Sequence, residues 1–420
     1  MDKFVIRGGR PLRGTIAIGG AKNATLALMP AAMLASGVFR FKNTPGLRDV
    51  HTMSILLRTM GMEIELDDHV LSIDTSRISG FEAPYEHVKK MRASIYVLGP
   101  LLARFGQAKV SLPGGCAWGP RPVNLHIEGM RKLGAEIDLE GGYIVARAHG
   151  LTGDLVHFDV SSVGATGNVL MAAVLAKGTT IIENAAIEPE ITFLAEFLVN
   201  MGAKIEGVGT NRLEIDGVDA LHPSDADTIP DRIEAGTFLV AGAITGGSLQ
   251  LEGVRSDHLS AVLEKLEDVG CHIVSEVNRV SLEAPDALRP VDVTAAIYPG
   301  FPTDMQAQWA ALMSRAGGSS VITDSIYPDR FKHVPELSRL GADIELRENA
   351  AVVRGARRLA GAKVMSTDLR GSASLILAGL IAEGTTEVLR VYHIDRGYET
   401  IERKLQILGA DIERVSEQEF

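Results

Sequence analysis

The segment LGAEIDL at residues 133–139 occurs six times in this chain, each time in a slightly altered form. The other copies are GMEIEL at 61–66, MGAKIEG at 201–207, VGCHIVS at 269–275, LGADIEL at 340–346 and LGADIER at 408–414. Successive glycines of this phrase lie 73, 68, 68, 71 and 68 residues apart. A fixed period of this length indicates one supersecondary unit that is copied along the chain. The sequence therefore predicts six structural repeats.

A second glycine precedes each copy at a nearly constant distance. The six positions are Gly37, Gly106, Gly178, Gly246, Gly317 and Gly384. The separation from this glycine to the phrase is 24 or 25 residues in five repeats and 28 in the second repeat. Insertions relative to a repeat map to loops, often on the binding face. The second repeat is therefore expected to carry a special loop.

Each repeat reads as a short strand, an Ala- and Leu-rich helix, a strand, a more amphipathic helix and a closing hairpin. NVLMAAVLAKG at 168–178 is one such apolar helix, and it ends at a glycine that can stop a helix without a Cβ penalty. The strands that follow alternate with period two. The predicted fold class is α/β, with β-α-β-α-β-β repeats.

The length of 420 residues favours two domains with three repeats each. Candidate crossings lie near Gly20 and Pro230. The prediction is a first domain at 20–229 and a discontinuous second domain at 1–19 plus 230–420, with the active site in the cleft between them.

The composition is that of an ordinary globular protein, with 46% hydrophobic and 23% charged residues. A net charge of −11 argues against nucleic-acid binding, which needs clustered Lys and Arg, but it allows a local basic site for a small anion. No apolar run has the length of a signal peptide or a membrane span. Two cysteines give no disulfide framework, and a cytoplasmic location without membrane insertion is expected.

Cations occupy an unusual place in the repeat, the start of the apolar helix. Lys22, Arg92 and Arg370 stand there, although a positive charge opposes the dipole of a helix N-terminus by roughly 0.3–1 kcal/mol. A bound polyanion would explain all three. Asp231 and Asp368 at the same position are equally well explained as N-caps.

The loop after the second strand holds a further set of cations, namely Arg121, Arg330 and Arg396. Six cations at two equivalent positions of the repeat indicate a site for a strongly anionic small molecule.

The inserted residues of the second repeat fall in PGGCAWGPRP at 113–122, and this segment is expected to be a lid. Cys116 lies five residues before Arg121, whose charge would favour the thiolate, so Cys116 is a candidate reactive thiol. Cys271 stands where other repeats have Ala and is expected in the core. The 11 histidines show no metal-ligand spacing, and His126 fits a structural role as well as a substrate role.

Ordered motifs along the whole chain resemble those of the bacterial UDP-N-acetylglucosamine 1-carboxyvinyltransferases, which are enolpyruvyl transferases. They include GGAKNA at 19–24, LPGGCAWGPRPVNLHI at 112–127, SVGAT at 162–166, FPTDMQAQ at 301–308, TDLRGSASLILAGLIAEG at 367–384 and YHIDRGYE at 392–399. The resemblance implies a two-domain inverse α/β barrel of six repeats. It also implies transfer of the enolpyruvyl group of phosphoenolpyruvate to the 3'-hydroxyl of UDP-N-acetylglucosamine, with release of phosphate through a tetrahedral ketal. The activity belongs to peptidoglycan synthesis, and with it to cell shape and division. No cofactor and no metal are implied.

The resemblance also implies roles for particular residues. Cys116 would be the acid that protonates the methylene carbon, or the thiol that carries a covalent adduct. Asp304 would be the base, or would only orient the hydroxyl. Lys22, Asn23, Arg121 and Arg396 would contact phosphoenolpyruvate, with Lys22 and Arg396 among the catalytic groups. The remaining substrate-binding residues are Arg92, Pro122, Val123, Asn124, Leu125, Val160, Ser161, Ser162, Val163, Ile326, Arg330, Asp368 and Arg370, and Arg121 and Asp304 also belong to this set.

Two positions depart from the family pattern. Val160 stands where some relatives carry a lysine, and Gly167 stands where many carry a glutamate. Two other functions remain open. One is a related enolpyruvyl transferase that acts on shikimate 3-phosphate, and the other is a non-catalytic paralogue that senses these ligands.

Overall fold

The computed structural model describes residues 2–89, 91–112, 123–355 and 358–416. The chain forms two compact units, one of Gly20–Ile229 and one of Met1–Gly19 together with Pro230–Phe420. It passes from one unit to the other after Gly19 and again after Ile229, beside the glycine and proline where the sequence analysis placed the crossings. Within each unit the two crossing segments hydrogen-bond: Asp231 N–H donates to Gly19 O at 2.9 Å, and Ala21 N–H donates to Ile229 O at 2.7 Å.

The described residues form six four-stranded sheets, one per repeat. In each sheet a short first strand runs parallel to the second, which in five sheets pairs with the last strand of the closing hairpin and in the sixth pairs with β1. The predicted β-α-β-α-β-β order is confirmed, as in the third repeat, β10 Leu155–His157, α6 Val163–Ala173, β11 Thr179–Glu183, α7 Pro189–Asn200, β12 Lys204–Glu206 and β13 Arg212–Asp216.

The other two repeats of the unit Gly20–Ile229 follow the same plan. The first consists of β14 Ala226–Asp227, α1 Lys22–Ala31, β3 Val38–Lys42, α2 Arg48–Thr59, β4 Glu63–Asp67 and β5 Val70–Asp74, with a 3₁₀ turn η1 Ala32–Leu34. The second consists of β6 Glu82–Ala83, α3 Tyr85–Val88, η2 Arg92–Val97, α4 Leu98–Phe105, β7 Gln107–Ser111, α5 Asn124–Lys132, β8 Glu136–Glu140 and β9 Tyr143–Arg147.

The discontinuous unit holds the remaining three repeats. The fourth consists of β2 Arg13–Ala17, α8 Arg232–Thr245, β15 Ser248–Glu252, η3 Ser256–His258, α9 Ser260–Val269, β16 His272–Glu276 and β17 Arg279–Glu283. The fifth consists of β18 Val293–Ala295, η4 Thr303–Met305, α10 Gln306–Met313, β19 Ser319–Asp324, α11 Val334–Arg339, β20 Asp343–Arg347 and β21 Ala350–Arg354. The sixth consists of β22 Lys363–Met365, α12 Leu369–Gly379, β23 Thr385–Leu389, η5 Val391–Arg396, α13 Ile401–Ile407, β24 Asp411–Ser416 and β1 Asp2–Arg7.

In the first and fourth repeats the opening strand is not the strand that directly precedes the apolar helix in the chain. β2 directly precedes α1 in the chain, yet it pairs with β15 of the fourth repeat. β14 directly precedes α8, yet it pairs with β3 of the first repeat. The chain crosses between the units immediately after each of these strands, so each strand stays with the sheet of the unit that the chain is leaving.

The glycine of the repeated phrase has the same conformation in all six repeats. Its φ lies between +87° and +111° at Gly61, Gly134, Gly202, Gly270, Gly341 and Gly409. This left-handed region is costly for residues with a Cβ, and it lets the chain turn from the second helix into the hairpin. The regular spacing of these glycines therefore reflects the need for a left-handed residue at this turn of each repeat.

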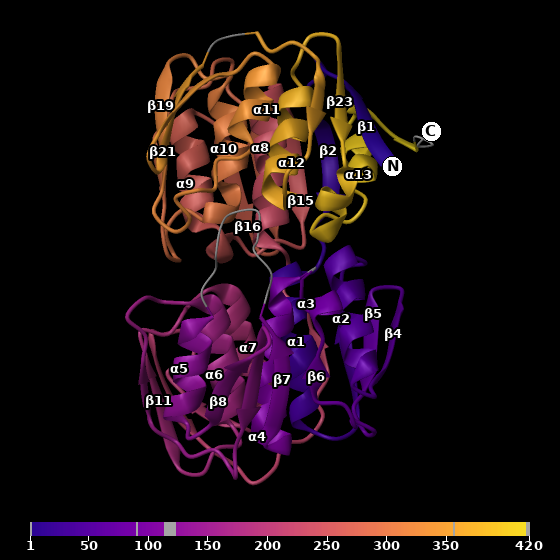
Figure 1. Cartoon of the computed structure of the whole chain (residues 1–420). Coiled ribbons are helices and arrows are strands. Elements are labelled where there is room, and N and C mark those ends of the chain that lie inside the picture. The colour runs from indigo at the N-terminus through magenta and orange to yellow at the C-terminus, as the bar shows by residue number, and fades with distance from the viewer. Residues whose placement is uncertain (1, 90, 113–122, 356–357, 417–420) are drawn as a thin grey trace. The chain divides into compact units, whose positions relative to one another are not determined.

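The Ala-rich helices lie inside each unit, and each unit has its own hydrophobic core. In the discontinuous unit α8, α10 and α12 pack against one another, with the sheets outside them (Figure 1). Every residue of α10 and α12 is buried, which explains why these helices show no polar face in the sequence. Cys271 is a buried core residue as predicted, and burial raises the pKa of its thiol to about 12.

Candidate functional site

The densest polar cluster among the predicted site residues surrounds Asp304. Its Oδ1 lies 2.7 Å from Nη2 of Arg330, and its Oδ2 lies 2.9 Å from Nη2 of Arg370. Both arginine side chains are buried, whereas the Asp304 side chain is 26% exposed. The carboxylate is therefore the part of the cluster that solvent or a small molecule can reach.

Three elements of the discontinuous unit bring these side chains together. Asp304 lies in η4 at the head of α10, Arg330 lies in the loop between β19 and α11, and Arg370 lies in the first turn of α12. Arg330 lies in the loop after the second strand of its repeat, and Arg370 lies at the start of the apolar helix. These are the two positions of the repeat where the sequence shows cations.

Asp324, the last residue of β19, holds the Arg330 loop in place. Its Oδ1 accepts the backbone N–H groups of Ile326 and Tyr327 at 2.9 and 2.8 Å. Its Oδ2 accepts the Thr303 hydroxyl at 2.6 Å, and Thr303 Oγ1 accepts from Arg330 Nη1 at 2.9 Å. One fully buried carboxylate thus fixes both the loop that carries Ile326 and the residue before Asp304.

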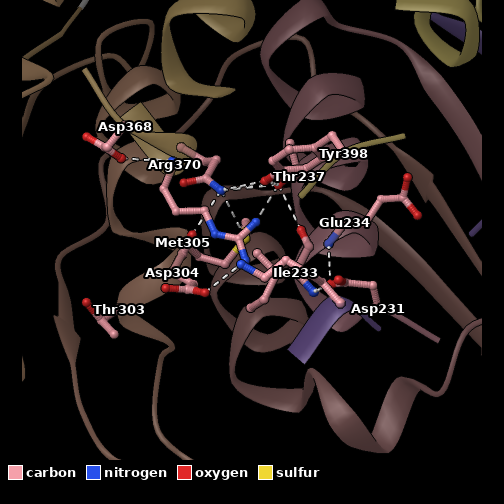
Figure 2. Close-up of polar contacts among 12 residues, drawn as sticks. Asp231, Ile233, Glu234, Thr237, Thr303, Asp304, Met305, Asp368, Arg370 and Tyr398 are labelled. Carbon is pink, nitrogen blue, oxygen red and sulfur yellow. Dashed lines mark hydrogen bonds and ion pairs between the residues drawn. The ribbon is translucent and has the colours of Figure 1, made fainter. Parts of the chain in front are cut away.

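The Arg370 guanidinium combines a strong ion pair with an unused donor. Burial alone disfavours its charge, but the Asp304 carboxylate outweighs burial and raises the pKa of Arg370. Its Nη1 is buried and has no hydrogen-bond partner among the described residues. Its central carbon lies 5.4 Å from the centre of the Tyr398 ring (Figure 2). A buried charged donor that lacks a partner is uncommon in folded proteins.

Asp368 and Asp231 are helix N-caps. Asp368 Oδ1 accepts the N–H groups of Arg370 and Gly371 at 2.9 and 2.8 Å, at the start of α12. Asp231 Oδ1 accepts the N–H groups of Ile233 and Glu234 in α8 in the same way. The capping alternative from the sequence therefore holds for both, and a substrate role for Asp368 stays a prediction.

In the unit Gly20–Ile229, Lys22 begins α1 and its ammonium lies 3.4 Å from the buried carboxylate of Asp49. Asn23 is exposed in the same first turn, and Arg92 begins η2. The ion pair explains how a lysine is tolerated at a helix start, and it keeps the ammonium in one place.

The segment from Val160 to Val163 leads into α6. Ser162 caps this helix through its Oγ, which accepts Ala165 N–H at 3.3 Å. Val160 is 62% exposed and Val163 is 36% exposed, while Ser161 is half-buried. Gly167, the second departure from the family pattern, makes room for a ring, because a Cβ there would lie 2.9 Å from Tyr96.

The other predicted residues lie at loop ends or outside the described residues. Val123, Asn124 and Leu125 stand at the start of α5, with Asn124 exposed. Arg396 ends η5, which packs against α12. Cys116, Arg121 and Pro122 lie outside the described residues, so their roles, the lid and the shared cleft stay predictions.

His126 has a structural role. It is 1% exposed, and its Nδ1 lies 3.0 Å from Asn168 Nδ2. The same amide donates to Ile95 O at 2.8 Å, and its oxygen accepts Gly99 N–H at 2.7 Å, which fixes its orientation. Nδ1 of His126 is therefore the acceptor. Burial, together with the charge of Arg92, lowers the pKa of His126 to about 3.

Sequence reasoning missed the buried polar residues beneath Asp304, namely Thr237, Gln308 and Tyr398. Gln308 was visible as a polar residue inside the apolar stretch QAQWAALM, and Thr237 occupies the same position of the fourth repeat, nine residues before the marker glycine. No local sequence pattern indicates that Gln308 contacts Tyr398, which lies 90 residues away in the chain.

The described residues contain no group of three or more His, Cys, Asp or Glu that could hold a metal ion. Within the same ranges no helix is both long and apolar enough to cross a bilayer. A hollow of about 380 Å³ lies at the start of α2, lined by Arg48, His51 and Arg58 among others, and none of the predicted site residues line it. The cluster around Asp304 is therefore a better candidate for the functional site than this hollow.

Comparison with known proteins adds an independent observation. Residues 6–405 match the family described as EPSP synthase (3-phosphoshikimate 1-carboxyvinyltransferase). The chain is 62% identical to the UDP-N-acetylglucosamine 1-carboxyvinyltransferase of Chloroherpeton thalassium, over 100% of this chain and 99% of that protein. It is 57% identical to the protein of the same name from Chlorobium chlorochromatii, over 100% of both chains.

Two solved structures have a fold similar to that of this chain. The enolpyruvyl transferase NikO from Streptomyces tendae superposes with a TM-score of 0.91 at 26% identity and covers 99% of both chains. EPSP synthase from Acinetobacter baumannii reaches a TM-score of 0.77 at 20% identity, over 99% of this chain and 100% of that one, which is a likeness of fold.

Proposed function

This chain belongs to the EPSP synthase family of enolpyruvyl transferases, and we propose that it transfers the enolpyruvyl group of phosphoenolpyruvate to the 3'-hydroxyl of UDP-N-acetylglucosamine. The observation that carries the proposal is 62% identity, along the whole chain, to a protein named for this reaction. The reaction releases phosphate and is the first committed step towards peptidoglycan. We place the enzyme in the cytoplasm, in keeping with its lack of a disulfide framework.

The charge of the substrates explains the cations. Phosphoenolpyruvate and a nucleotide diphosphate together bring about five negative charges, which are costly to remove from water without partners. We assign Lys22, Asn23, Arg121 and Arg396 to phosphoenolpyruvate. Arg330 and Arg370 complete the cationic wall, behind the partly exposed Asp304 carboxylate.

We assign the nucleotide sugar to the remaining predicted residues. They are Arg92, Pro122, Val123, Asn124, Leu125, Val160, Ser161, Ser162, Val163, Asp304, Ile326 and Asp368, and Arg121 is shared between the substrates. The exposure of Val160, Val163 and Asn124 supports this, because these side chains are accessible to a ligand.

Addition requires a proton on the methylene carbon of phosphoenolpyruvate and loss of a proton from the sugar hydroxyl as oxygen bonds to C2. We assign the first proton to the Cys116 thiol and give Asp304 the second. Departure of phosphate, with loss of a methyl proton, restores the vinyl ether. Asp304 suits its role because its carboxylate, held by two guanidinium groups, has about four acceptor positions and is partly exposed.

The decisive experiment measures phosphate release from phosphoenolpyruvate with each acceptor in turn. Release with UDP-N-acetylglucosamine and none with shikimate 3-phosphate is expected. Release only with shikimate 3-phosphate would assign the other enolpyruvyl transfer. Calorimetric binding of both ligands without phosphate release would instead indicate a sensing protein.

Reaction with an epoxide electrophile distinguishes the thiol of Cys116 from that of Cys271. Cys271 is buried and its thiol pKa is raised to about 12, so it has little thiolate at neutral pH. Labelling is expected at Cys116 and should depend on UDP-N-acetylglucosamine. Peptide mass spectrometry that found the label on Cys271 would contradict the assignment of Cys116.

A further inference from the structure

We propose that Thr237, Gln308 and Tyr398 form a positioning unit that fixes Asp304 and Arg370 for the transfer reaction. The proposal rests on the proposed function and adds residues to its machinery. All three side chains are buried, with exposed fractions of 2%, 0% and 1%, so they act through other groups and do not touch the substrate.

The three side chains hydrogen-bond to one another, and Figure 2 shows Thr237 beside Tyr398. Gln308 Nε2 lies 2.9 Å from the backbone carbonyl oxygen of Asp304 and 3.2 Å from each of Thr237 Oγ1 and Tyr398 OH. Thr237 Oγ1 lies 2.8 Å from Tyr398 OH. Segments from α8, α10 and the chain after η5 thus converge on the backbone of the proposed base.

Two backbone carbonyls fix the directions of the two hydroxyl protons and the orientation of the Gln308 amide. Thr237 Oγ1 lies 2.8 Å from Ile233 O, a carbonyl that can only accept, so the Thr237 proton points there. Thr237 must then accept from Tyr398 OH, whose own oxygen is left to accept from Gln308. The carbonyl of Asp304 likewise requires the amino side of the Gln308 amide.

This orientation of the Gln308 amide costs folding free energy. Gln308 Oε1 is buried and has no hydrogen-bond partner among the described residues. A buried acceptor without a partner destabilises the fold, and an apolar residue of similar size would avoid the cost. A need to hold the Asp304 carbonyl explains why an amide occupies this position.

The same unit supports Arg370. The Tyr398 ring lies under the guanidinium at 5.4 Å from its carbon, a cation–π contact that favours one orientation of the fork. Burial raises the pKa of Tyr398, so the hydroxyl keeps the proton that it donates to Thr237. One unit therefore fixes the backbone of Asp304 and the side chain that binds its Oδ2.

The test compares Thr237→Val, which removes the hydroxyl at equal size, with Thr237→Ser, which keeps it. Thr237→Val is expected to lower kcat by about tenfold and to leave KM for both substrates within about twofold, because misplacing reacting groups affects the transition state. Thr237→Ser should restore most of kcat. Tyr398→Phe keeps the ring under Arg370 and should lower kcat in the same way.

Thr245→Val is the matched control. Thr245 lies in the same helix, is also buried, and its hydroxyl donates to Ala241 O at 2.7 Å as Thr237 does to Ile233. It should lower thermal stability and leave kcat of the folded enzyme unchanged. Equal kcat values in Thr237→Val and Thr245→Val, at a temperature well below unfolding, would overturn the positioning role. A wild-type enzyme that released no phosphate would instead refute the proposed function.

Discussion

At the scale of the residue, the central feature is a carboxylate between two buried guanidinium groups. The Asp304 carboxylate forms an ion pair with each of Arg330 and Arg370, whose side chains are otherwise enclosed by protein. Removal of this carboxylate leaves two guanidinium groups without their shared counter-charge in a medium of low dielectric constant. A change at Asp304 is therefore expected to affect both turnover and folding, and the two effects need separate measurements.

Asp304→Asn is expected to lower kcat by roughly 10²- to 10⁴-fold, the range for a lost general base. It should also lower the free energy of unfolding by about 1–3 kcal/mol, less than for a fully buried pair because Asp304 is partly exposed. Phosphate release and thermal unfolding measure these effects. Asp268→Asn, at an exposed ion pair with Lys265, is the control and should change neither. Turnover within tenfold of wild type would leave Asp304 only an orienting role.

His126 gives the fold a dependence on pH. The pKa of His126 is lowered to about 3 in the folded chain, against the usual 6.5 of an exposed imidazole in the unfolded chain. Below pH 6.5 the unfolded chain therefore binds a proton that the folded chain does not, and stability falls as pH falls.

The free energy of unfolding is expected to drop by about 1.4 kcal/mol per pH unit from this group between pH 6 and pH 4. His126→Gln should remove that part of the slope, whatever it does to stability at pH 7. Urea titrations at several pH values test this, with the exposed His149→Gln as control. An unchanged slope in His126→Gln would show that His126 is protonated in the fold.

At the scale of the element, the starts of α8 and α12 are built alike. Each has an aspartate whose Oδ1 accepts two N–H groups of the first turn. The two capping residues can therefore be compared directly. Only Asp368 is also predicted to bind substrate.

Asp231→Ala and Asp368→Ala should each cost about 1–2 kcal/mol of stability through loss of the cap. If Asp368 also binds the nucleotide sugar, Asp368→Ala should raise KM for UDP-N-acetylglucosamine several-fold more than Asp231→Ala does. Thermal unfolding and initial rates with varied acceptor give both quantities. Equal KM values in the two variants would restrict Asp368 to capping.

The sequence predicted the elements well because their causes are local. The glycine at Gly134 and its five counterparts needs a left-handed φ, and this requirement shows directly in the spacing. The units that hold β2 and β14 agree with the predicted crossings, because residues 1–19 were assigned to the discontinuous domain and residues 20–229 to the other. The contact of Gln308 with Tyr398 was missed, since it joins distant repeats and no local pattern shows it.

At the scale of the whole molecule, the two units have separate cores, and the first strand belongs to the last sheet. β1 lies between β23 and β24, with Lys3 opposite Leu389 and Val415. Phe4 is fully buried in the core of the discontinuous unit, and Phe39 of β3 is fully buried in the core of the other.

Phe4→Ala and Phe39→Ala should each cost about 3–5 kcal/mol in the unit that contains them. Hydrogen–deuterium exchange on the intact chain is expected to show faster exchange in Pro230–Phe420 for Phe4→Ala. For Phe39→Ala the faster exchange should lie in Gly20–Ile229. The same loss of protection throughout the chain in both variants would mean that the two units unfold together.

The position of β1 has a consequence for the order in which the protein is made. Among the described strands β1 is synthesised before the others, whereas both of its neighbours, β23 and β24, follow after more than 370 intervening residues. The repeats of Gly20–Ile229 can complete their sheets during this interval, except that β3 waits for β14. The sixth sheet cannot close until β23 and β24 have been made, so the apolar side chains of Phe4 and Ile6 have to be kept from aggregation until then.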